Sequence, residues 1–177
     1  MDNGKTEKII IIGGAGSGKD HLRKELVKLG LKYSPKFTTR PMRVNEIQGE
    51  DYDFINEERY LKLLGQNSFK TKQSFFVNGQ IWYYGITKEN WEKNQVFIMT
   101  TEELSQLTTQ ERKESFVVYL RIRKEIRIQR LLERSDNNDS IQRRIESDGR
   151  DFASFKDYDL LLTDENFDCN FVYDLMN

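Results

Sequence analysis

The sequence has very few of the residues from which disulfide frameworks and multi-histidine metal centres are built. Its 177 residues include one cysteine, Cys169, and one histidine, His21. A single cysteine excludes an intrachain disulfide, and a single histidine excludes a metal site with several histidine ligands. It also leaves no obvious catalytic triad. These absences are typical of a protein from a reducing compartment.

Long apolar runs and an excess of either charge are also missing. The chain has 28 basic and 29 acidic residues and a formal net charge of −1, so bulk attraction to nucleic acid or to an anionic membrane is not expected. We find no signal peptide and no apolar run long enough to cross a bilayer. We therefore expect a cytoplasmic protein that binds neither nucleic acid nor membrane.

The most informative stretch is a short apolar run followed by a glycine-rich turn. Four consecutive isoleucines, residues 9–12, predict a strand buried on both faces. The spacing G-x-x-x-x-G-K follows, the P-loop motif. Small residues let successive backbone N–H groups surround an anion, and the helix that begins at Lys19 directs its positive end there. The residues expected to bind nucleotide phosphates are Gly13, Gly14, Ala15, Gly16, Ser17, Gly18, Lys19 and Asp20.

Asp20 departs from this motif, because a serine or threonine whose hydroxyl binds Mg²⁺ normally stands at its position. The carboxylate could hold the ion, directly or through water, or it could cap the N-terminus of the helix. The residues alone do not separate these roles.

The rest of the chain alternates strands with helices, apart from one β-rich stretch. Residues 33–85 are dense in aromatics and largely lack helical periodicity, which indicates an inserted lobe. Within it, residues 74–84 predict a hairpin with a type I′ turn at Asn78-Gly79, and Asn56 is expected to cap a short helix.

The elements expected after this stretch are a strand at 96–99, a helix over 101–113 opened by a Thr100–Glu103 capping box, a strand at 116–120, a helix to about Arg134, a helix from Ser140, a strand at 158–162 and a helix at 168–176. Together with the P-loop they predict a three-layer α/β sandwich with a parallel central sheet. The chain should form a single domain, residues 1–177, with its core at 8–32 and 86–177.

A second set of phosphate-binding groups follows the P-loop by about twenty residues. Arg40 and Arg43 lie three residues apart on an extended segment that contains Pro41, so their guanidinium groups can converge on one phosphate. The hydroxyl of Tyr52 can add a third donor. A solvated basic turn is the alternative, but the position after a P-loop favours a receptor for a second phosphate.

These features together resemble the guanylate kinase family. The resemblance covers nearly the whole chain: the P-loop, the T-T-R-x-x-R and G-x-D-Y segments, the Y-Y-G of residues 83–85, the arginine-rich helices and the last strand. It implies that Arg40, Arg43, Tyr52 and Tyr84 hold the phosphate of the acceptor.

The family also implies a short arginine-rich lid, at about residues 134–150. Its pattern R-x-x-x-R, polar lid, R-R fits Arg130, Arg134 and Arg143-Arg144. Such guanidinium groups stabilise the charge on a transferring phosphoryl group. The resemblance implies that Arg134 and Arg144 act in catalysis with Lys19. The family packs the adenine after the last strand, which here is followed by Thr163.

Three other arginines of this region, Arg121, Arg123 and Arg127, are expected to lie on solvated helix faces.

Departures from the family concern the acceptor base. Lys36 stands where a serine that contacts the base or phosphate is usual, so we count it among the acceptor-binding residues. The glutamate expected just after Phe69 is missing, and Thr100 and Thr101 replace acidic residues. A site that hydrogen-bonds a specific edge rejects other substrates strongly, so losing these groups leaves guanine specificity open.

The resemblance implies an enzyme that uses Mg²⁺ and ATP to phosphorylate a nucleoside monophosphate, GMP or dGMP, as a monomer or homodimer. Other (deoxy)nucleoside monophosphates stay open as acceptors. Ribose 1,5-bisphosphate also stays open, because its phosphokinases share the G-K-D variant and a similar hairpin. The non-enzyme alternative is a guanylate kinase-like binding module, which the intact Gly18-Lys19 disfavours.

Overall fold

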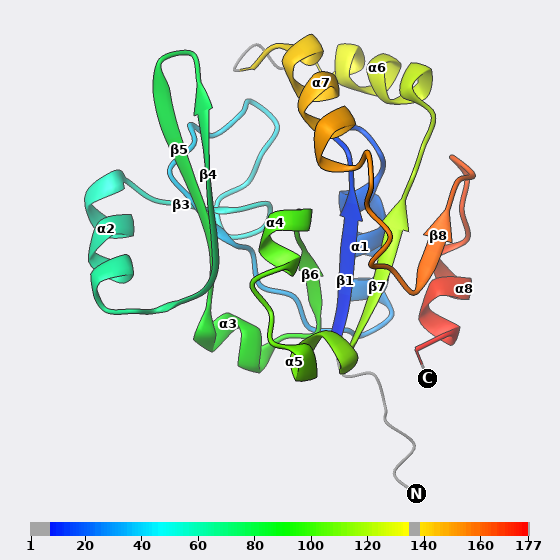
Figure 1. Cartoon of the computed structure of the whole chain (residues 1–177), viewed down its shortest axis with the longest axis horizontal. Coiled ribbons are helices and arrows are strands. Elements are labelled where there is room, and N and C mark those ends of the chain that lie inside the picture. Colours follow the sequence, from blue (N-terminus) through cyan, green and yellow to red (C-terminus); the bar gives the residue numbers. More distant parts are fainter. Residues whose placement is uncertain (1–7, 135–138, 177) are drawn as a thin grey trace, which may run out of the picture.

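The computed structural model describes residues 8–134 and 139–176. A parallel sheet with the strand order β6-β1-β7-β8 forms the centre of the molecule (Figure 1). Its strands are β1 (Lys8–Gly13), β6 (Val96–Ile98), β7 (Ser115–Leu120) and β8 (Leu160–Leu162). β1 lies inside the sheet, and its four isoleucines are fully buried, as expected for a strand covered on both faces.

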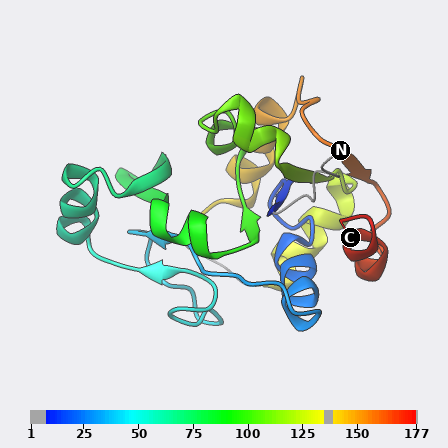
Figure 2. The same ribbon diagram turned by 90° about the horizontal axis from the view of Figure 1, so that it is seen from below.

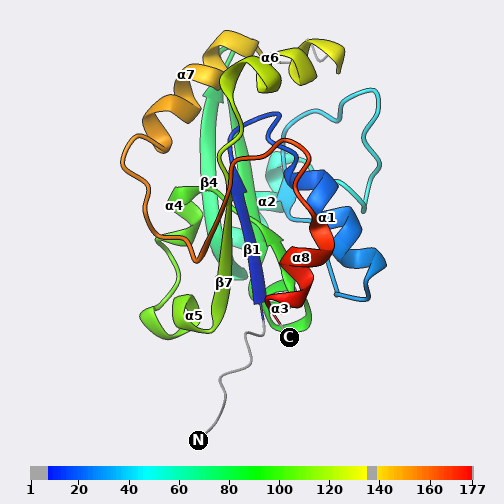
Figure 3. The ribbon, with the colours of Figure 1, turned by 90° about the vertical axis from the view of Figure 1, so that its right-hand side faces the viewer.

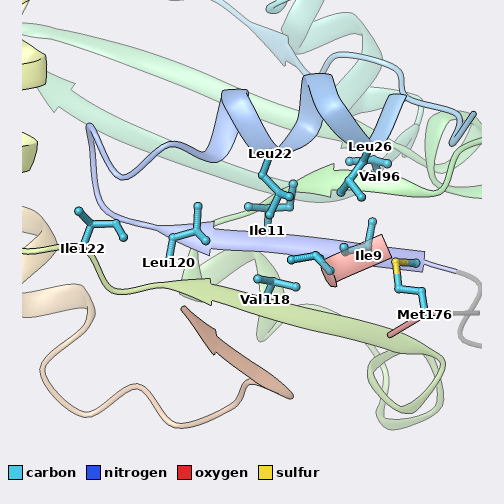
Figure 4. Close-up of a cluster of buried hydrophobic side chains, with 10 residues drawn as sticks. Ile9, Ile11, Leu22, Leu26, Val96, Val118, Leu120, Ile122 and Met176 are labelled. Atoms are coloured by element: carbon cyan, nitrogen blue, oxygen red, sulfur yellow. The ribbon is translucent and has the colours of Figure 1, made fainter. Parts of the chain in front are cut away.

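Helices cover both faces of this sheet. Ile9 and Ile11 pack against Leu22 and Leu26 of α1 (Lys19–Lys28) (Figure 4). Val172 of α8 (Cys169–Asp174) belongs to the same cluster. On the opposite face, Ile10 and Ile12 pack with apolar side chains of α3 (Lys88–Lys93) and of the segments that follow β6 and α7. Figure 3 shows α1 and α8 on one side of β1 and the short helices after β6 on the other. The predicted three-layer α/β sandwich is therefore confirmed.

A second sheet lies to one side of the first and has the order β3-β2-β5-β4 (Figure 2). Its strands are β2 (Phe37–Thr38), β3 (Asp53–Phe54), β4 (Phe69–Val77) and β5 (Gln80–Thr87). The β4–β5 hairpin turns at Asn78 (φ 50°) and Gly79 (φ 80°), the two positive φ angles that a type I′ turn needs. Asn56 Oδ1 caps α2 (Glu57–Gly65) by accepting from Arg59 N at 2.9 Å. The sheet reaches two residues past the predicted lobe boundary at 85, and the division into core and lobe stays a prediction.

The predicted single helix over 101–113 is wrong. Two short helices are present instead, α4 (Thr101–Leu104) and α5 (Thr109–Lys113). The predicted Thr100–Glu103 capping box opens the first. Thr108 opens the second with a capping box of its own, in which Glu111 Oε2 accepts from Thr108 N at 2.8 Å. Thr108 has extended backbone (ψ 159°), so a helix cannot continue through it.

Two helices between β7 and β8 lie beyond the carboxyl end of β1 (Figure 1). They are α6 (Lys124–Glu133) and α7 (Ile141–Asp151), and Ser140, from which a helix was predicted, caps α7. Residues 135–138, which belong to the predicted lid, lie outside the described residues. In the two described ranges, no helix combines the length and apolar character needed to span a membrane.

Candidate functional site

The P-loop joins β1 to α1 through a turn that depends on its glycines. Gly16 has φ +77° and Gly18 has φ +100°, conformations that other residues rarely adopt. A Cβ atom on Gly13 would lie 2.6 Å from Ser17 Oγ, and one on Gly16 would lie 2.7 Å from the carbonyl oxygen of Arg127. The predicted strand, loop and helix are thus all present, and the loop is closely packed.

Lys19, the first residue of α1, folds its side chain back over this loop. Its Nζ donates hydrogen bonds to Gly13 O at 2.7 Å and to Gly14 O at 2.8 Å. Burial lowers the pKa of Lys19 from 10.5 to about 8, against the raising influence of Asp148 and Asp20. The ammonium is therefore held at the loop by carbonyl groups, from which it can turn toward a phosphate.

A carboxylate from α7 already touches the loop. Asp148 Oδ2 accepts a hydrogen bond from Ala15 N at 2.9 Å and forms an ion pair with Arg127. Arg127 Nε donates to Ala15 O at 2.8 Å. Both peptide groups of Ala15 are thus engaged by side chains from distant helices.

Arg127 is a correction, because the sequence pattern placed it on a solvated helix face. It is half-buried on the P-loop, whereas Arg121 and Arg123 are exposed, as expected. The overlooked signal is spacing: Arg127 precedes Arg130 by three residues, so both lie on the same face of α6. Asp148 was missed altogether.

Arg130 connects the P-loop to the segment after β8. Its Nη1 donates to Gly16 O at 3.3 Å and its Nη2 donates to Glu165 O at 3.2 Å. The segment near Thr163 therefore runs close to the P-loop. Thr163 itself is exposed.

The other arginines named from the sequence differ in their surroundings. Arg134 is exposed at the end of α6, yet its charge is close enough to help lower the pKa of Lys19. Arg143 Nε and Arg144 Nε donate to the carboxylate of Asp139, at 2.6 and 3.2 Å. Burial disfavours the charged form of Asp139, but these arginines outweigh it and keep its pKa below the usual value.

The acceptor cluster, which we define as Arg40, Arg43, Tyr52 and Tyr84, is brought together as the sequence predicted. The guanidinium of Arg40 lies 5.2 Å from the ring centroid of Tyr52, and the rings of Tyr52 and Tyr84 meet edge to face at 5.9 Å. Burial raises the pKa of both tyrosines to about 12. Their hydroxyls therefore stay protonated and can donate to an anion.

Glu46 holds the two arginines of this cluster, and sequence reasoning missed it. Arg40, 3% exposed, donates from Nη2 to Glu46 Oε1 at 2.6 Å. Arg43 N donates to Glu46 Oε2 at 2.8 Å. The signal was the i,i+3 spacing of Arg43 and Glu46, which permits such a contact across a turn.

A cavity of about 210 Å³ joins the P-loop to the acceptor cluster. Its lining includes Gly13, Ala15, Lys19, Lys36, Tyr52, Tyr84 and Arg144, all of which were named from the sequence. Hairpin residues, the end of β6 and one side of α7 complete it. The P-loop and the two tyrosines of the acceptor cluster therefore border one space.

Asp20 lies directly after Lys19 and is half exposed. Its Oδ1 is 3.6 Å from Arg23 Nε, and the Gly18 cap of α1 has no side-chain hydrogen bond. Among the residues that the structure describes, no group of three or more histidine, cysteine or acidic side chains could hold a metal by itself. Mg²⁺ is commonly bound by one or two carboxylates together with substrate phosphates, and the Asp20 carboxylate fits that donor set.

Comparisons with known proteins agree on one family. A family model described as guanylate kinase matches residues 5–175. The guanylate kinase of Rickettsia felis is 30% identical over 169 residues, which cover 90% of this chain and 86% of that protein. The guanylate kinase of Mycoplasma mobile is 40% identical over 96 residues, 52% of this chain but only 45% of that protein.

A solved structure shows the same fold. The crystal structure of guanylate kinase from Anaplasma phagocytophilum superposes with a TM-score of 0.64, over 97% of this chain and 83% of that one. The two sequences are 17% identical there, so this likeness concerns the fold alone.

Proposed function

This chain belongs to the guanylate kinase family, and we propose that it transfers the γ-phosphoryl group of ATP to GMP or dGMP in the cavity between the P-loop and the acceptor cluster. The cavity is the observation that carries this proposal, because Lys19 and Tyr52 both line it. The donor and acceptor phosphates can therefore meet in one space.

The P-loop and Lys19 would bind the donor phosphates. Backbone N–H groups and a helix N-terminus attract phosphate oxygens, and the ammonium adds a movable positive charge. A phosphate at the Ala15 N–H would have to displace the Asp148 carboxylate, which accepts that bond at 2.9 Å. The adenine would extend toward the segment near Thr163, which Arg130 ties to the loop.

The acceptor cluster would hold the monophosphate in line with the donor. Arg40 and Arg43 supply guanidinium groups that Glu46 orients, and Tyr52 and Tyr84 supply hydroxyl donors. A phosphate oxygen is already nucleophilic, so no general base is needed. That oxygen forms a bond to the γ-phosphorus while the bond from this phosphorus to the bridging oxygen breaks, and ADP leaves.

Positive charge near the transferring group would stabilise its transition state. Lys19, Arg134 and Arg144 are the candidates, and the Asp139 carboxylate orients Arg144 at 3.2 Å. A bound Mg²⁺ would supply charge neutralisation of the donor phosphates, and the Asp20 carboxylate would hold it. A cytoplasmic location and a monomeric or homodimeric state stay predictions from the sequence.

The test is ADP release by the purified chain with Mg²⁺ and ATP, against GMP, dGMP, AMP, CMP, UMP, dTMP and ribose 1,5-bisphosphate. We expect turnover with GMP or dGMP and none with ribose 1,5-bisphosphate. Lys19→Ala is the control and should lose turnover, because the P-loop lacks another ammonium. Binding of ATP without turnover on any acceptor would overturn the proposal in favour of a binding module.

A further inference from the structure

One face of the β4–β5 hairpin forms a largely aromatic side of the cavity, on which the rings of Phe75 and Tyr84 meet edge to face at 5.5 Å. Phe75 pairs with Trp82, and Gln73 pairs with Tyr84, so these four side chains lie on the same face of the hairpin. All four line the cavity. We call them the hairpin face. An apolar slot of this kind suits a flat heterocycle whose orientation is set by a few polar groups.

Lys36 is a charged group that lines the same cavity as the hairpin face. Its Nζ is 2.7 Å from Glu103 Oε2. Among the described residues, Glu103 accepts a hydrogen bond from this ammonium. An ammonium has three N–H donors. The remaining donors are available to a ligand in the cavity.

Glu103 itself does not line the cavity. It is fully buried, and its carboxylate also accepts from Thr100 N at 3.0 Å and lies 3.5 Å from the Thr71 hydroxyl. The carboxylate of Glu103 is therefore engaged by groups of the protein itself, and it holds Lys36 in position.

The other carboxylates of the cavity lie on the opposite side, on α7. Asp148 is engaged by Ala15 and Arg127, and Asp151 is exposed. On the hairpin and β6 side, the described lining residues with polar atoms in their side chains are Lys36, Tyr52, Gln73, Trp82, Tyr84, Thr100 and Thr101, and none of them is a carboxylate. The amide of Gln73 is itself occupied, because its oxygen accepts from Thr100 Oγ1 at 2.5 Å and its nitrogen donates to Glu102 at 2.9 Å.

We propose that Lys36, held by Glu103, donates to the 6-oxo group of a purine monophosphate, and that this protein phosphorylates IMP as well as GMP. An ammonium pairs with an oxo group but meets the amino group of adenine donor to donor. Guanine differs from hypoxanthine by a 2-amino donor, for which this side of the cavity offers no carboxylate. The reaction is unchanged: an IMP phosphate oxygen bonds to the γ-phosphorus of ATP, and ADP leaves.

This inference rests on the proposed function, and the acceptor series separates the two. We expect kcat/KM for IMP to lie within about tenfold of that for GMP, and kcat/KM for AMP to be lower by roughly a thousandfold or more. If GMP is turned over but kcat/KM for IMP is about a thousandfold lower, the IMP inference is overturned and the proposed function stands. A difference of that size is on the order of the effect of an unpaired buried polar group. Failure with GMP and dGMP would overturn the proposed function itself.

The role of Lys36 is tested by Lys36→Met. We expect the GMP/AMP and IMP/AMP ratios of kcat/KM to fall by about a hundredfold, with KM for ATP unchanged. Lys70→Met is the matched control: Lys70 lies on β4 and pairs with Glu111 at 2.5 Å, but it does not line the cavity. It should leave these ratios as they are.

A second variant is needed in case Lys36→Met does not fold, because that substitution leaves the buried carboxylate of Glu103 without its ion-pair partner. In Lys36→Met/Glu103→Gln the buried charge is gone, and glutamine still serves the capping box. The same loss of selectivity is expected. Base selectivity equal to that of the unaltered protein, in either variant, would overturn the assignment.

Discussion

Asp148 Oδ2 and the backbone N–H of Ala15 form a 2.9 Å hydrogen bond between α7 and the P-loop. The loop is shaped to receive phosphate oxygens, so the carboxylate occupies an anion position before nucleotide arrives. Arg127 is paired with the same carboxylate and bonded to Ala15 O. Three segments far apart in the chain therefore meet where ATP is expected to bind.

Replacing Asp148 by alanine should tighten ATP binding. The apparent Kd of a ligand that must displace an internal group is the intrinsic Kd divided by the fraction of molecules in which the site is open, so we expect Kd for ATP to fall by about tenfold. Removing a negative charge near the triphosphate acts in the same direction. Titration calorimetry with ATP measures the change.

The control for this variant is Asp151→Asn, which alters an exposed carboxylate on the same helix and in the same cavity but not on the P-loop. It should change Kd for ATP little. Weaker ATP binding by Asp148→Ala would mean that Asp148 supports the bound state instead of competing with it.

The activity should fall at alkaline pH because of Lys19. Its pKa of about 8 means that the free protein loses this charge as the pH rises through 8. We expect kcat/KM for ATP to be level below that value and to decrease above it. Lys19→Arg, which stays protonated, should lack this decrease. A profile that remains level to pH 10 in the unaltered protein would contradict the assignment.

The lowered pKa of Lys19 also predicts how the stability of the protein changes with pH. Burial makes the folded protein bind this proton less tightly than the unfolded chain, whose lysine has a pKa of 10.5. The contribution of Lys19 to the free energy of unfolding should therefore increase between pH 8 and 10.5. Urea unfolding of the unaltered protein and of Lys19→Met across this range isolates that contribution.

Arg40→Lys should impair binding of the acceptor. Lysine cannot reproduce a guanidinium that bonds to Glu46 at 2.6 Å and to Pro41 O at 2.7 Å while facing Tyr52. We expect kcat/KM for GMP to fall by a factor that corresponds to about 2–4 kcal/mol in activation free energy. KM for ATP should change little. Steady-state kinetics in which both GMP and ATP are varied will measure these two quantities. Arg59→Lys, an exposed arginine on α2, serves as control.

Two glycine substitutions should have opposite effects on stability. Gly16→Ala forces a side chain into φ +77°, with its Cβ 2.7 Å from the carbonyl oxygen of Arg127, and should destabilise by about 2 kcal/mol or more. Gly149→Ala places a Cβ inside α7, where nothing lies within 4 Å, and should stabilise by about 1 kcal/mol. Urea unfolding distinguishes them. A Gly16→Ala variant as stable as the unaltered protein would contradict the packing described for the loop.

Much of the fold could be predicted because its signals are local. The isoleucines of β1, the glycine spacing of the P-loop, the Asn78-Gly79 turn, the cap at Asn56 and the Thr100–Glu103 capping box each act over a few residues. The error at 101–113 was also local, since Thr108 and Glu111 carry a capping signal that was overlooked. The period with which apolar side chains recur indicates which face of a helix or strand is buried, and it can be read without knowing the rest of the fold.

The sequence by itself determined the P-loop, the layered α/β architecture and the pair Arg40 and Arg43. Only the tertiary structure decided that Glu103 lies behind Lys36, 67 residues away, and that Asp148 reaches Ala15 across 133 residues. The sequence around an acidic residue on a helix contains no periodic pattern that identifies its hydrogen-bond partner in another element. Its partner depends on how the layers pack, because burial makes a carboxylate pair with whichever donor the packing brings near.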